Sequence, residues 1–141
     1  MDERRATEIL WDAFQKGEYF PEPLLGALTI EQAYGVQLGM LERWLAAGEK
    51  QAGWKAGATS AAARKAVGAE EPYFGYLLNK RALPSPQRFP FDEMRVAAVE
   101  VELCFTLSAQ LKGPGVTREQ AVAAVSAVAP ALEIMEMRGD L

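Results

Sequence analysis

The stretch VAAVEVELCF, residues 96–105, places two glutamates inside an otherwise apolar run. Side chains of a β-strand alternate between its two faces, so Glu100 and Glu102 share one face. The other face is apolar, and we expect it to pack in the protein core; it carries Val99, Val101, Leu103, Phe105 and Leu107. The stretch therefore predicts a long strand, within residues 95–111, that has one apolar face and one acidic face.

The acidic face has several interpretations. Residues two apart in a strand have Cα atoms about 6.5–7 Å apart. Two carboxylates at this spacing either face water, retain a proton, or hold a cation between them. A third glutamate, Glu133, lies among apolar residues in PALEIMEMR, residues 130–138. Together the three would supply an all-oxygen site for a hard divalent cation. Glu136 is the alternative ligand, on the opposite face of that strand, and a merely solvated acidic face stays open as an interpretation.

The composition narrows the chemistry of any site. The chain has 141 residues, half of them hydrophobic, and a net charge of −4, which argues against nucleic acid as a partner. The single cysteine, Cys104, excludes an intrachain disulfide. The absence of histidine excludes Ser-His-Asp and Cys-His nucleophile schemes and histidine-ligated zinc. A metal here must be bound by oxygen atoms, which favours magnesium, manganese or calcium.

The N-terminus gives no targeting signal. MDERRATEIL, residues 1–10, opens with charged residues and lacks the apolar segment of a signal peptide. No apolar run approaches the length needed to cross a bilayer, so we expect no membrane association. The expected location is the cytoplasm.

The order of elements predicts an α+β fold, with a helical region over residues 1–48 and a β-rich region over residues 49–141. Helices are expected over residues 3–16, 29–48, 60–67 and 118–128. Strands are expected over residues 51–59, 71–78, 95–111 and 131–138. Thr29 with Gln32 and Thr117 with Gln120 fit the capping-box pattern, and Pro130 is expected to stop the last helix.

A second candidate group lies in AGWKAGATS, residues 52–60. Lys55 lies among glycine, tryptophan and alanine. It is either a positioned cation or acid–base group, or an ordinary surface lysine. Thr59 and Ser60 either cap the next helix or donate hydrogen bonds to an anion at its start.

Four segments taken in series resemble the 2-keto-4-pentenoate hydratase family of the fumarylacetoacetate hydrolase superfamily, which also includes 4-oxalocrotonate decarboxylases. They are LTIEQAYGVQ, GWKAGATSAAARKAVGAEEPYFGYLL, VAAVEVELCFTL and VAPALEIMEMR, and they cover about residues 28–138. Members of the family are typically longer, so the resemblance concerns their N-terminal part. It implies N-terminal helices followed by the first part of a mixed β-roll.

The resemblance also implies a site and an activity. Glu100, Glu102 and Glu133 match carboxylates that bind Mg²⁺ or Mn²⁺, and Lys55 matches the active-site lysine; Thr59, Ser60, Tyr73 and Phe74 would contact a small 2-oxo acid substrate. The implied activity is hydration of 2-oxo-4-enoic (2-hydroxydienoic) acids in aromatic-compound catabolism. Tyr73 replaces an acid that some hydratases carry, which keeps a 4-oxalocrotonate-type decarboxylase as the alternative.

We expect the chain to form an assembly. Unpaired strand edges and many apolar residues predict a homo-oligomer, or pairing with a related subunit or a separate C-terminal half. A non-catalytic truncated paralogue or assembly subunit is the competing interpretation of the chain.

Overall fold

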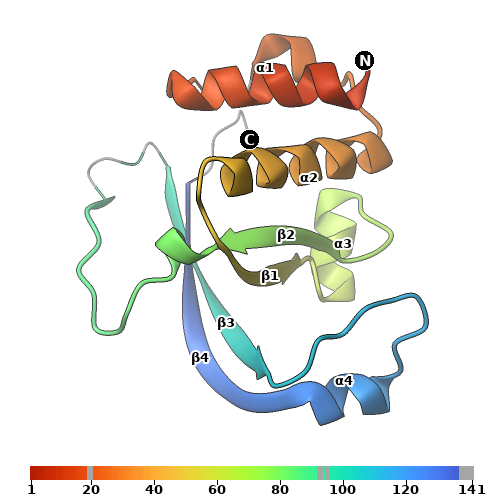
Figure 1. Cartoon of the computed structure of the whole chain (residues 1–141), viewed down its shortest axis with the longest axis vertical. Coiled ribbons are helices and arrows are strands. Elements are labelled where there is room, and N and C mark those ends of the chain that lie inside the picture. Colours follow the sequence, from red (N-terminus) through yellow and green to blue (C-terminus); the bar gives the residue numbers. More distant parts are fainter. Residues whose placement is uncertain (19–20, 92–93, 95, 137–141) are drawn as a thin grey trace. The chain divides into compact units, whose positions relative to one another are not determined.

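The structure is a computed structural model that describes residues 1–18, 21–91, 94 and 96–136. The helices are α1 (Glu3–Gln15), α2 (Ile30–Ala46), α3 (Ala61–Val67) and α4 (Arg118–Ala124), with short 3-10 helices η1 (Glu22–Leu24) and η2 (Asn79–Arg81). The strands are β1 (Gln51–Gly57), β2 (Tyr73–Leu78), β3 (Ala97–Leu107) and β4 (Val125–Glu136). The long helices α1 and α2 precede the strands, whereas the short helices α3 and α4 each lie between two strands, an order that fits an α+β fold (Figure 1).

Backbone contacts divide the chain into two units, Met1–Arg88 and Phe89–Leu141, and each is described by itself. The sequence predicts a different boundary, at residue 48, between a helical region and a β-rich region. This boundary stays a prediction. Arg95 and residues 137–138, which the expected strands included, lie outside the described residues. No helix in the described part of the chain is both long enough and apolar enough to cross a membrane.

Local capping interactions start the helices where the sequence predicts. The Thr29 hydroxyl accepts a hydrogen bond from the Gln32 backbone N–H, while the Gln32 side chain accepts one from the Thr29 N–H, so α2 begins with a complete capping box. Thr117 and Gln120 repeat this arrangement at α4. These reciprocal bonds satisfy N–H groups that have no partner inside a helix.

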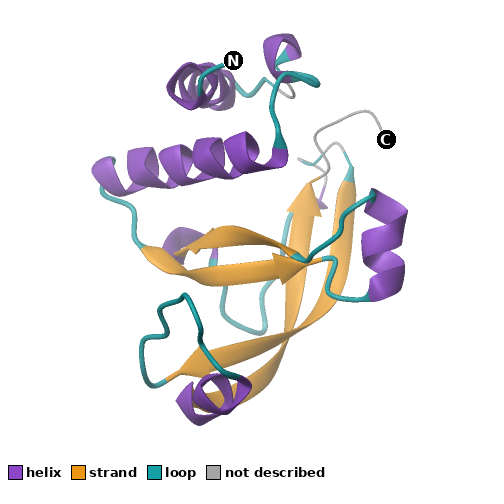
Figure 2. Cartoon of the chain, turned by 90° about the vertical axis from the view of Figure 1, so that its right-hand side faces the viewer, coloured by secondary structure: helices purple, strands orange, loops and turns teal. Residues whose placement is uncertain are grey.

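The first unit stacks α1, α2 and the β1–β2 sheet in layers, with α2 in the middle (Figures 1 and 2). Its core lies where Trp44 of α2 meets Leu78 of β2, and Trp11 and Phe14 of α1 pack against it. The Trp11 and Trp44 rings meet edge to face with centroids 4.8 Å apart. The helices therefore cover one face of the β1–β2 sheet, the face that carries Phe74, Tyr76 and Leu78.

The second unit is built on a long antiparallel pair, β3–β4 (Figure 2). The register pairs Val99 with Ile134, Glu100 with Glu133 and Val101 with Leu132. Residues paired directly across such a ladder share a face of the sheet. One face is therefore apolar on both strands apart from Glu136 at the end of β4, and the other carries Glu100, Glu102 and Glu133.

The boundary between the last helix and the last strand differs from the expected one. Helix α4 ends at Ala124 rather than near residue 128, and β4 begins at Val125 and continues through Pro130, which pairs with Leu103. Proline lacks the N–H that a central strand must donate, but an edge strand tolerates it. In the described part of the chain β4 pairs with β3 alone, so an edge is available to Pro130.

Among the described residues of the second unit, no element covers the apolar face of β3, contrary to the expectation that this face packs in a core. Val101 is 84% exposed, and Leu103 and Phe105 are also exposed. Exposed Val128 and Leu132 continue the same face on β4. An alternating pattern identifies the apolar face of a strand, but it does not supply the element that covers this face.

Candidate metal centre

Glu100, Glu102 and Glu133 come together on the acidic face of β3–β4. Glu133 stands directly opposite Glu100 across the ladder, and Glu102 follows two residues later on the same face. Each residue offers a carboxylate oxygen, and these oxygens all lie within 4.8 Å of one another. Glu100 is exposed and Glu133 is partly buried. The cluster places three negative groups around one point of the sheet.

The surroundings of the cluster suit a hard cation. On the same face Glu102 pairs with Ala131, and Cys104 pairs with Ala129, so small side chains flank the carboxylates and leave room at them. Carboxylate oxygens are the ligands that Mg²⁺, Mn²⁺ and Ca²⁺ prefer. Glu136 pairs with Ala97 on the opposite face, as expected from the alternation. The donor set present therefore fits a divalent metal of the magnesium type.

Lys55 lies in the middle of β1, in the first unit, whereas the glutamates lie in the second. Its side chain is partly buried and stands on the face of β1–β2 that is opposite α2. It pairs with Gly75 of β2, and a Cβ atom added to Gly75 would lie 3.2 Å from the Lys55 Cγ atom. The lysine stem therefore runs across the sheet over a glycine.

Ser60 has a structural role at the turn after β1. Its Oγ atom accepts a hydrogen bond from the Ala63 N–H, 3.1 Å away, and so caps α3. The neighbouring Thr59 carbonyl accepts one from Arg64 Nη1 at 2.9 Å. Ala58 between β1 and Thr59 has a φ of 52°, a strained conformation for a residue with a Cβ atom. Substrate contact by Thr59 and Ser60 stays a prediction.

Phe74 and Tyr73 point to opposite faces of β2. The Phe74 ring stacks on that of Tyr34 in α2, with centroids 4.4 Å apart, and meets Trp54 edge to face. Phe74 thus fixes α2 on the sheet, while Tyr73 stands on the face of Lys55. Substrate contact by Tyr73 and Phe74 stays a prediction.

Sequence reasoning did not select Gly57 and Gly75, although both border candidate site residues. A Cβ atom at Gly57 would collide with the Tyr73 ring, whose Cζ atom would be 2.8 Å away. The available signal was glycine inside a strand, which commonly marks the close approach of another group.

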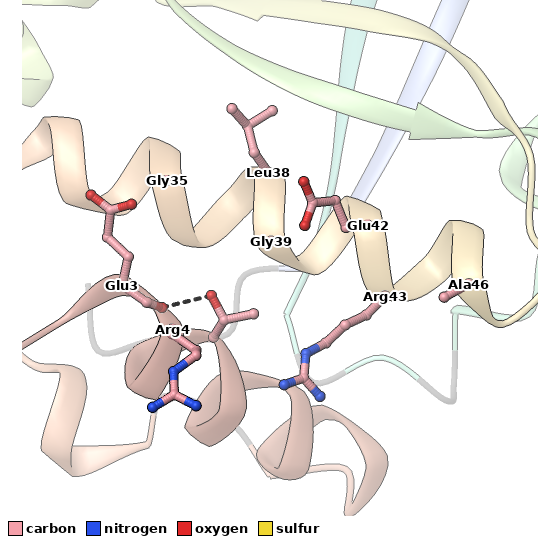
Figure 3. Close-up of a pocket in the computed structure, with 9 residues that line it drawn as sticks. Glu3, Arg4, Gly35, Leu38, Gly39, Glu42, Arg43 and Ala46 are labelled. Carbon is pink, nitrogen blue, oxygen red and sulfur yellow. Dashed lines mark hydrogen bonds between the residues drawn. The ribbon is translucent and has the colours of Figure 1, made fainter.

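A groove of about 710 Å³ lies between α1 and α2 (Figure 3). Small residues of α2, Gly35, Gly39 and Ala46, line it together with charged residues of both helices. Figure 3 shows Glu3 of α1 reaching over α2 at Gly35. None of the expected site residues lines this groove, so it belongs to the packing of the two helices rather than to the candidate metal centre.

Comparison with known proteins adds an independent line of evidence, although no family model matches the chain. The 2-hydroxypent-2,4-dienoate hydratase of Pseudomonas putida is 39% identical over 112 residues, which are 79% of this chain and 50% of that protein. The TodF product hydratase of Pseudomonas putida F1 is 33% identical over 137 residues, 96% of this chain and 51% of that protein.

A solved structure agrees with the sequence matches. The 4-oxalocrotonate decarboxylase from Pseudomonas putida G7, in complex with magnesium and adipate, superposes with a TM-score of 0.82 at 27% identity. The match covers 94% of this chain and 51% of the decarboxylase chain.

The matching proteins are hydratases and decarboxylases, and therefore lyases. The chain is homologous to the N-terminal half of the 2-keto-4-pentenoate hydratases and the 4-oxalocrotonate decarboxylases. It spans about half the length of the relatives it matches.

Proposed function

We propose that the chain carries the metal-binding carboxylates and the active-site lysine of a divalent-metal-dependent hydratase. Its substrates would be 2-oxo-4-enoic (2-hydroxydienoic) acids from the breakdown of aromatic compounds. The convergence of Glu100, Glu102 and Glu133 within 4.8 Å is the observation that carries the proposal. Homology to hydratases, including one that acts on 2-hydroxypent-2,4-dienoate, supports the substrate class.

The residues have separate roles in this proposal. The three glutamates would hold Mg²⁺ or Mn²⁺ through oxygen atoms, and the magnesium complex of the related decarboxylase supports this choice. When bound, the metal would polarise the keto oxygen of a 2-oxo acid as a Lewis acid. Lys55 would bring its Nζ group to the substrate, to hold a carboxylate or to move a proton. The homology supports a fold in which β3–β4 form part of a larger β-roll.

The nature of the product tests the proposal directly. The protein would be incubated with a 2-hydroxydienoate in the presence of Mg²⁺, and the product would be analysed by mass spectrometry. A gain of one water that depends on Mg²⁺ and is lost in Lys55→Met supports the hydratase. Turnover that persists unchanged in Glu133→Gln would contradict the role of the carboxylates.

A decarboxylase is the second candidate, because the solved structures that match at a TM-score of 0.82 are those of 4-oxalocrotonate decarboxylase. The same incubation with a 2-oxo-enedioate separates the two, since a decarboxylase releases carbon dioxide and a hydratase does not.

The exposed apolar face of β3–β4 supports a further part of the proposal, that the active form is an assembly. The partner would be a second copy of the chain, a related subunit or a C-terminal half such as the relatives have. A chain that stays monomeric at all concentrations and still turns over substrate would contradict this. A chain that assembles but binds neither Mg²⁺ nor a 2-oxo acid would instead be a non-catalytic subunit.

A further inference from the structure

Two side chains on the face of β1–β2 that is opposite α2 lie flat against the sheet, and each does so over a glycine. The stem of Lys55 crosses from β1 to Gly75 on β2, and the ring of Tyr73 crosses from β2 to Gly57 on β1. The register makes Lys55 and Tyr73 diagonal neighbours on this face, within reach of each other for side chains of their length.

Neither glycine is required by the backbone. Gly57 and Gly75 are not among the glycines with positive φ, and both lie within regular strands. What they provide is space. A Cβ atom at Gly75 would lie 3.2 Å from Lys55 Cγ and 3.4 Å from Cδ, and one at Gly57 would collide with the Tyr73 ring.

The two glycines restrict Lys55 in complementary ways. The rotamers that carry its stem across to β2 are open because Gly75 has no side chain. The rotamers that lead along β1 toward Gly57 are closed because the Tyr73 ring already covers that glycine. A long, flexible side chain thus has one preferred direction, and a functional group held in one place reacts more effectively than one that samples many.

We infer that Gly75, Gly57 and Tyr73 are positioning residues for Lys55, and that they hold its side chain across strand β2. This inference rests on the proposed function, because it assumes that the Lys55 ammonium group acts on a substrate. The placement itself depends only on contacts within the first unit. Gly53 offers a matched control, since it is on the same strand and the same face but has open space above it.

The experiment compares Gly75→Ala, Gly57→Ala and Gly53→Ala in the intact chain by NMR, with thermal melting as the check on folding. In the unmodified protein we expect nuclear Overhauser contacts between the Lys55 methylene protons and the Gly75 α-protons. We also expect an upfield ring-current shift of the Gly57 α-protons. Tyr73→Phe should keep this shift because it keeps the ring, and Tyr73→Leu should lose it.

A second measurement reports how the substitutions affect the placement of the Lys55 amine. It is the rate at which an amine-acylating reagent modifies Lys55, determined by peptide mass spectrometry. We expect Gly75→Ala and Tyr73→Leu to change this rate, and Gly53→Ala and Tyr73→Phe to leave it as in the unmodified protein. Equal rates in all variants, or the same change in Gly53→Ala, would overturn the inference. Divalent-metal binding, measured separately, distinguishes this result from a failure of the proposed function, because a chain that binds no metal can still hold Lys55 over Gly75.

Discussion

Glu100 and Glu133 face each other directly across the β3–β4 ladder. Like charges at directly opposed positions destabilise an antiparallel pair, and Glu102 adds a third carboxylate within 4.8 Å. The three carboxylates therefore repel one another when no cation is bound. The arrangement is explained if a cation is bound there and offsets the repulsion.

Replacing Glu100 by glutamine should therefore stabilise the metal-free protein. The amide removes one of the opposed charges, and the expected gain is about 0.2–1 kcal/mol in the free energy of unfolding. Urea denaturation in a chelating buffer measures it. Glu136→Gln is the control, because that residue lies on the other face and pairs with Ala97. A Glu100→Gln protein that is less stable than its parent without metal would contradict the repulsion.

Gly35 and Gly39 on α2 should respond differently to replacement by alanine. A Cβ atom at Gly39 would lie 2.8 Å from Oγ1 of Thr7, which is buried and donates a hydrogen bond to the Glu3 carbonyl. Because Thr7 is buried and held by this hydrogen bond, overpacking should cost about 1–3 kcal/mol and exceed the helix-propensity gain of about 1 kcal/mol. At Gly35 the obstacle is the end of the Glu3 side chain, which can rotate into solvent.

Thermal unfolding of the two variants tests this difference. Gly39→Ala should melt at a lower temperature than the parent protein, and Gly35→Ala at the same or a higher temperature. Equal shifts in the same direction would mean that α1 does not pack on α2 through these glycines.

Ala58→Gly should stabilise the turn between β1 and α3. Ala58 has a φ of 52°, where a residue with a Cβ atom is strained by about 1–2 kcal/mol and glycine is not. The greater freedom of glycine in the unfolded chain offsets part of this gain, which leaves roughly 0.5–1 kcal/mol. Gly68→Ala is the reciprocal control, because Gly68 has a φ of 68° and alanine should be unfavourable there. Chemical denaturation should show that the free energy of unfolding rises in Ala58→Gly and falls in Gly68→Ala.

Tyr76 should make the stability of the first unit depend on alkaline pH. Burial raises the pKa of Tyr76 above its ordinary value of 10.0, and a hydrogen bond from Trp44 and the charge of Arg81 oppose this shift only in part. Above about pH 10 the unfolded chain loses this proton before the folded chain does, so stability should fall as pH rises toward the folded pKa. The contribution is fully present below about pH 10.

Tyr76→Phe removes the titrating group and should flatten this dependence. Urea unfolding at about pH 9 and about pH 11, in the parent and the variant, gives the comparison. The same loss of stability in both proteins would assign the pH dependence to other groups.

Local structure was predictable where a few neighbouring residues determine it. Thr29 with Gln32 and Thr117 with Gln120 define helix starts, and the alternation around Glu100 defines a strand with two different faces. Lys55 stood out because a lysine lies between glycines in a strand pattern. In each case the information lies within about one turn of helix or one strand of the residue concerned.

Features that depend on distant residues could not be predicted in the same way. The pairing of Glu100 with Glu133 depends on the register across β3–β4, and a shift of one residue would move Glu133 to the other face. The capping box at Thr117 and the proline at residue 130 predict a helix over residues 118–128, whereas pairing with β3 makes Val125–Glu136 a strand. Whether the apolar face of β3 is covered depends on which other element packs against it. The residues of the strand itself do not determine this.

The most direct test of the central claim is a titration of the protein with Mn²⁺, followed by electron paramagnetic resonance of the free ion. The parent protein and Glu136→Gln should bind Mn²⁺ with the same affinity, and excess Mg²⁺ should displace it. Glu133→Gln should bind it about tenfold more weakly or worse, a loss of about 1.4 kcal/mol or more. Equal Mn²⁺ affinity in the parent and Glu133→Gln proteins would contradict a metal centre at Glu100, Glu102 and Glu133.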